Sequence, residues 1–418
     1  IQQMKSLFIF SVFAVSISFN AVAQKPQQWS SGEILHAMKK LNVLGSVLYM
    51  AAHPDDENTR LLAYMARARQ YRTGYMAMTR GDGGQNLIGN QQGFELGLIR
   101  TQELLAARRT DGAEQFFSRA FDFGFSKRTE EALSFWDKEK ILSDAVWVIR
   151  NFRPDIIITR FPEDSRAGHG HHSGSAVIAR EAFIAAADPN RFPEQFKYGV
   201  GPWKVKRIMW NTFSFFGTNT TSENQMKIEV GDFLPLLGKS IGEISADSRS
   251  QHRSQGFGSA GARGSATEYF QHTSGDAAEK DPMDGIDCSW KRVEGGDVVN
   301  ALINKMIAAY DVNNPSASVN ALLEIRTALA GIKDVYWNKL KTAEVEKLIR
   351  MVMGFYVEAV SDKQYIKQGD SLKVNLSMYN RSAVPAVVAK VELDKATWTP
   401  EATLKNNNNW AQTLALAI

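Results

Sequence analysis

Two short segments of this 418-residue chain carry histidines, the first together with acidic residues, at spacings that suit a divalent metal ion. The first is AHPDDE at residues 52–57, in which His53 and Asp56 can bind a metal while Asp55 stays free. The second is GHGHH at residues 168–172. Imidazole and carboxylate ligands together suit zinc. The two segments therefore predict a site made of His53, Asp56 and one histidine of the second segment.

Three protein ligands leave a fourth position for water, which is the arrangement of a catalytic zinc site. A structural zinc site takes four protein ligands, usually cysteines, and this chain has a single cysteine, Cys288. Two other interpretations stay open. The first segment can be an acidic helix start, and the second can be a surface histidine cluster. Divalent ions other than zinc also accept His and Asp ligands.

An alternation of buried strands and helices positions both segments. The strands at residues 43–51 and 155–159 are read from apolar runs, and the helix at residues 137–152 is read from apolar residues at helical spacing. The predicted strands are residues 43–51, 73–79, 114–121, 155–159 and 207–213, and the predicted helices are residues 59–70, 95–109, 137–152 and 173–187. Repeated strand–helix units predict an α/β, Rossmann-like layered domain with a mainly parallel sheet. Both segments follow a predicted strand, and ligands gather at the carboxyl ends of such strands.

Composition and periodicity divide the chain into four parts. Residues 1–23 are predicted to be a signal peptide, and residues 24–290 hold the α/β domain. Residues 291–362 have helical spacing without strands, and residues 363–418 alternate with period two, as the opening strands of a β-sandwich-like module do. The run NNNNW at residues 406–410 is typical of a loop. We expect this last module to be partial and the chain to be part of a longer protein.

The N-terminal residues predict export. A lysine is followed by a short apolar run and by AVA at residues 21–23, which is the pattern of a signal peptide cleaved before Gln24. We therefore expect a periplasmic or extracellular protein with no membrane span after cleavage. The net charge of +4 comes without a dense Lys/Arg block, and this argues against a nucleic-acid partner. The sequence leaves the oligomeric state open.

The two histidine segments resemble those of the PIG-L/LmbE-like zinc-dependent N-acetylglucosaminyl deacetylases. The first motif of that family, AHPDDE, stands unaltered at residues 52–57, and its H-x-x-H motif stands at residues 169–172. The resemblance implies that His53, Asp56 and His172 bind zinc. It also implies that Asp55 is the general base for attack by metal-bound water, and that His169 is the general acid or the oxyanion partner.

The chain departs from the family pattern near the second motif, where Gly-His replaces the usual Pro-Asp and Ala167 replaces a tyrosine. Arg166 and His171 are the candidate substitutes for the missing oxyanion partner. Two further segments supply candidate substrate contacts. Arg80 and Asp82 lie in a glycine-rich loop after the second predicted strand, and Arg100 lies one helical turn before Glu103. A tight turn and a surface ion pair are the plainer interpretations of these two segments.

Together these features predict a zinc-dependent hydrolase that removes an N-acetyl or other N-acyl group from an amino sugar or glycoconjugate. Three alternatives stay open: a zinc hydrolase that cleaves esters or other amides, a carbohydrate-binding protein without turnover, and a nucleotide-binding α/β domain. The glycine-rich loop lacks the G-x-G-x-x-G fingerprint, so it gives the nucleotide alternative little support.

Overall fold

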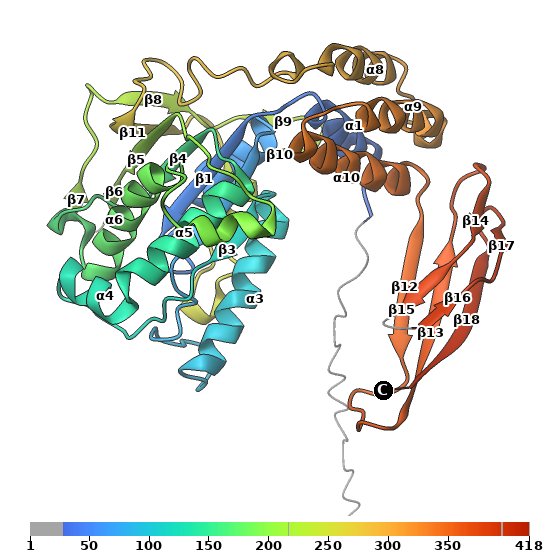
Figure 1. Cartoon of the computed structure of the whole chain (residues 1–418), viewed down its shortest axis with the longest axis horizontal. Helices are drawn as coiled ribbons and strands as arrows, with labels where there is room; N and C mark the ends of the chain where they lie inside the picture. The colour runs from blue at the N-terminus through green and yellow to red at the C-terminus, as the bar shows by residue number, and fades with distance from the viewer. Residues whose placement is uncertain (1–27, 216, 394–395, 418) are drawn as a thin grey trace, which may run out of the picture. The chain divides into compact units, whose positions relative to one another are not determined.

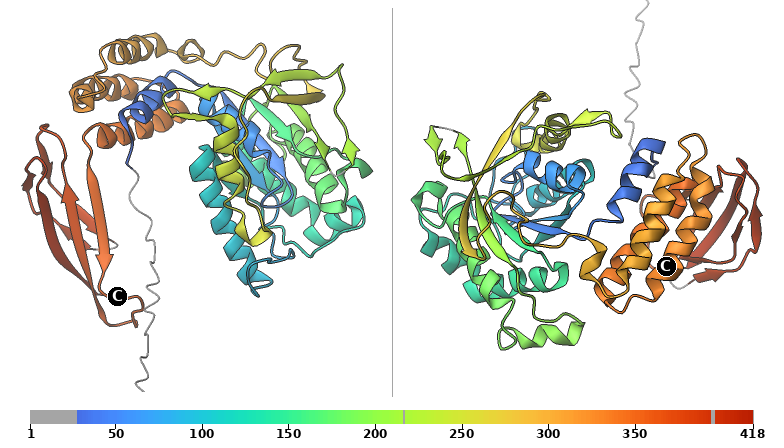
Figure 2. Two further views of the ribbon diagram at one scale, coloured as in Figure 1. Left: turned by 180° about the vertical axis from the view of Figure 1, so that it is seen from behind. Right: turned by 90° about the horizontal axis from the view of Figure 1, so that it is seen from above.

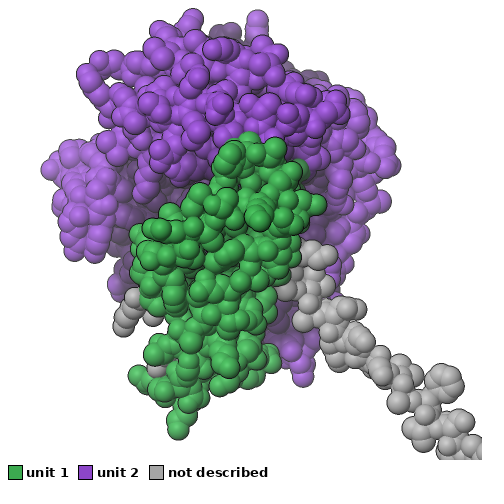
Figure 3. Space-filling model, turned by 90° about the vertical axis from the view of Figure 1, so that its right-hand side faces the viewer, with its two compact units in different colours: residues 1–29, 353–418 green, residues 30–352 purple. Residues whose placement is uncertain are grey.

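The computed structural model describes residues 28–215, 217–393 and 396–417 (Figure 1). The predicted signal peptide lies outside the described residues. The chain divides into two compact units, and residues 30–352 and 353–418 are coloured separately in Figure 3. No helix among the described residues is long and apolar enough to span a membrane.

A seven-stranded sheet forms the centre of the larger unit and confirms the predicted α/β class. Its strand order is β3-β2-β1-β4-β5-β11-β8, and β3, β2, β1, β4 and β5 are parallel. β11 pairs antiparallel with both β5 and β8. The strands are β1 (Ser46–Ala51), β2 (Arg72–Ala77), β3 (Glu114–Phe117), β4 (Ile156–Thr159), β5 (Arg207–Thr212), β8 (Met226–Glu229) and β11 (Thr267–Gly275).

Helices cover both faces of this sheet because successive side chains of a buried strand point to opposite faces. From β1, Leu48 and Met50 pack with α5 and α6, whereas Val47 and Tyr49 pack with α2 and α7. Figure 1 shows α4, α5 and α6 together, and the view from behind in Figure 2 shows α3 and α7. The helices are α2 (Thr59–Ala63), continued by a π-helical turn (Tyr64–Ala68), α3 (Phe94–Asp111), α4 (Thr129–Trp136), α5 (Lys138–Phe152), α6 (Gly170–Ala185) and α7 (Ile241–Arg249).

One strand is shorter than predicted. The sequence predicts a strand over residues 114–121, but β3 ends at Phe117. Beyond it Ala120 packs into the core beside α5 and α6, and the carbonyl of Phe121 accepts a hydrogen bond from Trp136. These tertiary contacts draw the chain away from the sheet and create a loop that carries Asp122.

Further helices complete the larger unit. α8 (Gly296–Ala308), α9 (Val319–Ala330) and α10 (Val335–Val352) follow one another, and α1 (Ser31–Lys40) contacts both α8 and α10. The buried ammonium group of Lys341 on α10 donates hydrogen bonds to the carbonyls of Lys40 and Val43. Short strand pairs, β6 with β7 and β9 with β10, lie in the connections of the larger unit: β6 (Ser214–Phe215), β7 (Thr218–Asn219), β9 (Phe233–Leu234) and β10 (Lys239–Ser240).

The smaller unit is antiparallel β-structure. Its main sheet has the order β12-β13-β18, and the predicted alternation from Leu372 to Met378 falls within β13. The predicted loop at residues 406–410 is wrong in part, because Asn409 and Trp410 open β18 and pair with Tyr379 and Met378. The strands are β12 (Tyr356–Ser361), β13 (Ser371–Tyr379), β14 (Ala386–Val388), β15 (Val391–Leu393), β16 (Ala396–Trp398), β17 (Ala402–Leu404) and β18 (Asn409–Ala417). The predicted domain boundaries at residues 290 and 362 stay predictions.

Candidate metal centre and active site

The topology brings the two histidine segments to one edge of the sheet. β1 lies between β2 and β4, so the chain runs outward in one direction through β2 and β3 and then in the other through β4 and β5. Such a switch in strand order opens a crevice at the carboxyl ends of the two central strands. Met50 of β1 pairs with Thr159 of β4, so the loop with residues 52–57 and the loop that leads to α6 leave the sheet side by side.

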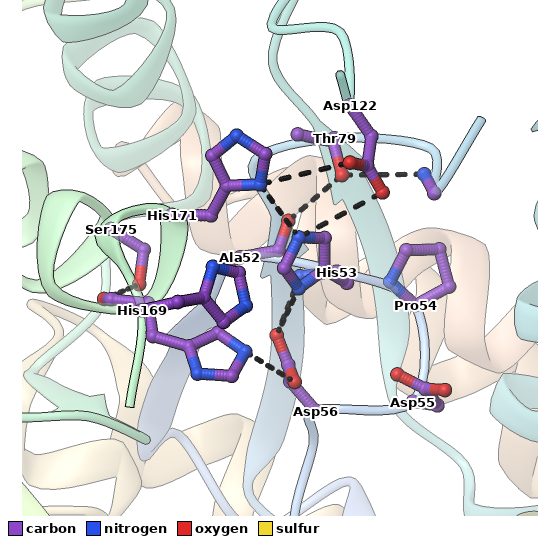
Figure 4. Close-up of polar contacts among 12 residues, drawn as sticks. Ala52, His53, Pro54, Asp55, Asp56, Thr79, Asp122, His169, His171 and Ser175 are labelled. Atoms are coloured by element: carbon purple, nitrogen blue, oxygen red, sulfur yellow. Dashed lines mark hydrogen bonds and ion pairs between the residues drawn. The ribbon is translucent and has the colours of Figure 1, made fainter. Parts of the chain in front are cut away.

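Asp56 contacts both His53 and His172. Figure 4 shows the contact between His53 and Asp56. Asp56 is placed between the two rings: its Oδ2 atom lies 3.1 Å from Nδ1 of His53, and its Oδ1 atom lies 3.3 Å from Nε2 of His172. The backbone N–H of His53 donates a further hydrogen bond of 2.7 Å to Asp56. His169 adjoins this group, with ring centroids 5.3 Å from His53 and 3.9 Å from His172.

The ring of His172 is oriented as a metal ligand requires. Its Nδ1 atom lies 2.7 Å from the carbonyl of Ala167, and a carbonyl only accepts, so Nδ1 carries the hydrogen. Its Nε2 atom then faces the carboxylate of Asp56, so that a metal ion could be bound by both side chains. A hydrogen bond from the distal ring nitrogen to a carbonyl is the usual support of a metal-bound histidine.

The donor atoms of this group fit zinc. The ligand atoms of His53, His169 and His172 lie within 4.8 Å of one another, and Asp56 contacts two of the three rings. Burial opposes the charge of Asp56, but His172 and His53 outweigh it and lower its pKa well below the usual range. Burial, together with His172 and His53, lowers the pKa of His169 to about 3. A deprotonated carboxylate beside neutral imidazole is the state that binds a metal.

Asp55 lies next to this cluster without joining it. Its φ angle is 89°, in the left-handed region that costs a non-glycine residue roughly 1–3 kcal/mol. Its Oδ2 atom is 3.2 Å from the guanidinium of Arg100, which also donates hydrogen bonds to the carbonyls of Pro54 and Gly81. Burial raises the pKa of Asp55, and Arg100 opposes this shift. The result is a fixed carboxylate with a raised basicity at the edge of the cluster.

The opposite side of the His53 ring faces a second set of polar side chains. Its Nε2 atom lies 3.1 Å from Nδ1 of His171 and 3.8 Å from the carboxylate of Asp122. His53, His171 and Asp122 are all buried, and their ligand atoms lie within 4.8 Å of one another. Burial disfavours the charged His53 ring, but Asp56 and Asp122 outweigh it and raise its pKa. His53 therefore contacts acidic groups on both sides.

Glu57, the last residue of the first segment, lies in a buried network of charges. Its carboxylate accepts hydrogen bonds from the backbone N–H of Asp55 at 2.9 Å, from His252 at 2.8 Å and from Arg108 at 3.1 Å. Burial opposes the charge of Glu57, but His252 and Arg108 outweigh it and lower its pKa to about 2. Asp111 shares Arg108 with Glu57 at 2.6 Å. The network joins the loop of residues 52–57 to α3 and to the turn after α7.

A cavity of about 890 Å³ opens beside the cluster. Asp55, Asp56 and His172 line one part of it. Arginines from separate segments line other parts, together with hydroxyl groups and the aromatic rings of Phe161, Phe213, Phe257 and Tyr269. The lining arginines are Arg60, Arg160, Arg166 and Arg249. Its volume matches that of small-molecule sites, which is about 300–1,000 Å³.

The predicted substrate contacts fall in different places. Arg166 lines the cavity, is exposed and forms an ion pair of 2.7 Å with Asp164. Arg100 is buried, contacts Asp55 and does not line the cavity. Asp82 is half-buried, and Arg80 is exposed and stacks over Phe117; neither lines the cavity. His171 does not line it either, because its ring is fully buried against Trp136 and Phe123.

The sequence interpretation missed Asp122 and gave His252 no specific partner. Asp122 stands alone in a loop after β3, with no histidine or acidic neighbour in sequence to mark it. The ring of His252 donates a hydrogen bond to Glu57, a residue 195 positions away. Only the fold brings these side chains to the first segment.

Residues 48–183 match the family profile described as PIG-L, GlcNAc-PI de-N-acetylase. This part of the chain is a PIG-L domain. The chain is 30% identical over 181 residues to 1D-myo-inositol 2-acetamido-2-deoxy-alpha-D-glucopyranoside deacetylase of Geodermatophilus obscurus, which covers 39% of this chain and 60% of that relative. It is also 30% identical over 169 residues to mycothiol S-conjugate amidase of Streptomyces coelicolor, which covers 37% of this chain and 57% of the relative.

Among solved structures, N,N'-diacetylchitobiose deacetylase from Pyrococcus horikoshii aligns with a TM-score of 0.37 and 20% identity. That alignment covers 50% of this chain and 70% of the other. The chain spans less than two thirds of the length of the Geodermatophilus deacetylase and of the Streptomyces amidase. Residues 48–183 include His53, Asp56, His169 and His172, whereas His252 lies beyond them.

Proposed function

We propose that this protein is a metal-dependent deacetylase that hydrolyses the N-acetyl amide of an amino sugar or glycoconjugate. The observation that carries the proposal is the placement of Asp55. Asp55 lines the cavity next to the cluster of His53, Asp56 and His172. Asp56 bridges the two histidines, and the carboxylate of Asp55 takes no part in those contacts. A carboxylate that adjoins such a cluster without serving as a ligand is the arrangement that amide hydrolysis by activated water requires.

His53, Asp56 and His172 would hold the metal ion, and the donor set favours zinc. Bound there, zinc would supply Lewis acidity, which lowers the pKa of water and polarises the amide carbonyl. The chain supplies three ligands and leaves His169 beside them as a group that does not have to bind the metal. That zinc is the ion bound in the cell is part of the proposal.

Asp55 is the proposed general base. It accepts a proton from the attacking water and can return that proton to the departing amine, since an amine leaves an amide only when protonated. Burial raises its pKa, which strengthens it as a base. Arg100 fixes the carboxylate in place from one side.

His169 is the proposed partner of the developing oxyanion. Ser126 Oγ accepts the N–H of His171 and lies 3.2 Å from Nδ1 of His169, so its own hydrogen can be donated to that nitrogen. Nε2 of His169 then carries the ring hydrogen and can donate it. Because its pKa is lowered to about 3, the ring is neutral near pH 7 and has no second proton to give. This assigns the leaving-group proton to Asp55 and the hydrogen bond to His169.

The relatives support an amino-sugar substrate, since the Geodermatophilus protein is named for the deacetylation of an acetamido sugar. The cavity volume of about 890 Å³ and its hydroxyl, guanidinium and aromatic lining suit a sugar of one or two rings. A zinc esterase and a carbohydrate-binding protein without turnover are the alternatives. The placement of Asp55 outside the ligand set argues against binding without turnover, because a purely binding site has no use for a buried base.

Export remains part of the proposal. The apolar run and the AVA sequence before Gln24 support it. Fractionation of a Gram-negative bacterial host that expresses the full chain, followed by N-terminal sequencing, tests it. A mature protein outside the cytoplasm that begins at Gln24 supports export, and an unprocessed cytoplasmic protein contradicts it.

The deciding experiment measures acetate release from a panel of N-acetylated amino sugars by the zinc-loaded and the chelator-treated protein. We expect release only with metal, and a decrease in kcat of about 10²- to 10⁴-fold in Asp55→Asn at unchanged metal content. Asp144→Asn makes the same chemical change in an ion pair with Arg119 outside the site and should leave kcat unchanged. Stoichiometric zinc without acetate release from any member of the panel would contradict the deacetylase, and ester cleavage alone would favour the esterase.

A further inference from the structure

The backbone at Asp55 adopts a conformation that a non-glycine residue takes only when its surroundings hold it. Its φ angle is 89°, and its carboxylate lines the cavity. The direction of that carboxylate depends on this backbone geometry. The neighbours that fix the backbone therefore decide whether the carboxylate reaches the site.

Two groups hold the backbone of Asp55. Arg249 donates a hydrogen bond to its carbonyl. The N–H of Asp55 donates to Oε2 of Glu57 at 2.9 Å. Glu57 is only 3% exposed, so this hydrogen bond is shielded from water. The orientation of the Glu57 carboxylate is thus transmitted directly to Asp55.

His252 fixes the other oxygen of Glu57. Its Nε2 atom lies 2.8 Å from Oε1 of Glu57, and the ring is fully buried. Its Nδ1 atom has no hydrogen-bond partner among the described residues. A neutral ring with the hydrogen on Nε2 leaves only a lone pair unsatisfied, so His252 donates to Glu57 alone. Arg108 also contacts Oε1 at 3.1 Å, but it is shared with Asp111 at 2.6 Å.

We propose that His252 is a positioning residue for the general base, which it holds in place through Glu57 and the Asp55 backbone. The inference rests on the proposed function of Asp55. His252 makes no contact with the metal ligands, and it does not line the cavity. A chain of hydrogen bonds runs from its ring to Glu57 and from Glu57 to the backbone of Asp55.

The segment that carries His252 also lines the cavity. His252 follows α7 directly, and the same segment supplies Arg249, Phe257 and Ser259 to the lining of the cavity. The guanidinium of Arg249 also stacks over the Phe257 ring at 3.8 Å. The segment that faces the substrate is therefore the segment that fixes the base.

The test compares His252→Leu, which removes the donor, with His252→Gln, whose amide nitrogen can reach the Nε2 position. Ser254→Ala is the matched control, because Ser254 is equally buried in the next turn but donates to Glu103 instead. We expect His252→Leu to lower kcat by about 10- to 100-fold with KM and zinc content little changed. His252→Gln should restore most of kcat, and Ser254→Ala should leave it near wild type even if its thermal stability falls.

A crystal structure of metal-loaded His252→Leu gives a readout that does not depend on turnover. We expect Asp55 to leave its left-handed conformation or its carboxylate to move by more than about 1 Å. An unchanged Asp55, or an equal loss of kcat in Ser254→Ala and His252→Leu, overturns the proposal. Absence of turnover in the wild-type protein contradicts the proposed function, and the crystal structure still decides the role of His252.

Discussion

The two sides of the His53 ring present the same residue types in different surroundings. On one side Asp56 and His172 line the cavity, with side chains 11% and 18% exposed. On the other side Asp122 and His171 are 5% and 0% exposed, and Trp136 stacks on the His171 ring. Each side therefore offers a carboxylate and a second imidazole. Only the first side can admit water and a substrate, so access separates a candidate catalytic centre from its buried support.

The largest effect should come from the accessible side. Asp56→Asn removes the carboxylate that contacts both His53 and His172. We expect its zinc affinity to fall by more than the roughly 10- to 100-fold that loss of an outer support costs. Competition with a chromophoric chelator measures this affinity. Asp164→Asn, an exposed acid on the loop before α6, should bind zinc as the wild type does.

A smaller effect should come from the buried side. Asp122 lies 3.8 Å from Nε2 of His53 and restrains that ring without facing the cavity. We expect Asp122→Asn to lower zinc affinity about tenfold, as loss of an outer support does. The same chelator competition measures it. If Asp122→Asn loses zinc as completely as Asp56→Asn, the two sides of the His53 ring contribute equally to zinc binding. That result would contradict the distinction between an accessible metal-binding side and a buried supporting side.

The buried side should also make stability depend on pH. Burial and the adjacent His53 lower the pKa of His171 from the usual 6.5 to about 3. Between these values the unfolded chain binds a proton that the folded protein does not, so stability is full above pH 6.5 and is lost as the pH falls towards 3. In thermal unfolding of the metal-free proteins, the midpoint of the wild type should fall more steeply between pH 6.5 and pH 3 than the midpoint of His171→Gln. Parallel curves would show that His171 does not contribute.

The smallest effect should come from the rim of the cavity. Arg166 is exposed and its guanidinium is already held by Asp164 at 2.7 Å. An exposed ion pair contributes about 0–1 kcal/mol. We expect Arg166→Ala to change KM by less than about fivefold and to leave kcat and the unfolding midpoint close to wild type. A fall in kcat of about a hundredfold would instead identify Arg166 as an oxyanion partner.

The comparison also shows why some residues could be predicted and others could not. His53, Asp55 and Asp56 share one short segment, and a buried apolar run before them marks the end of a strand. Local sequence is enough for that prediction because strand ends carry ligands in parallel sheets. The spacing of His169 and His172 is equally local. Asp122 and His252 have no such neighbours, so no sequence pattern marks them.

The sequence by itself determined the alternation of strands and helices, and with it the α/β class and the position of both histidine segments after β1 and β4. It did so because buried strands and amphipathic helices leave periodic apolar patterns in the chain. Only the tertiary structure decided that His171 is buried and His172 faces the cavity, and that Glu57 connects Asp55 to His252. Neighbouring residues on a helix point in different directions, and contacts between distant segments depend on how the helices pack over the sheet. The burial of a side chain is therefore a property of the packed layers, and local sequence does not specify it.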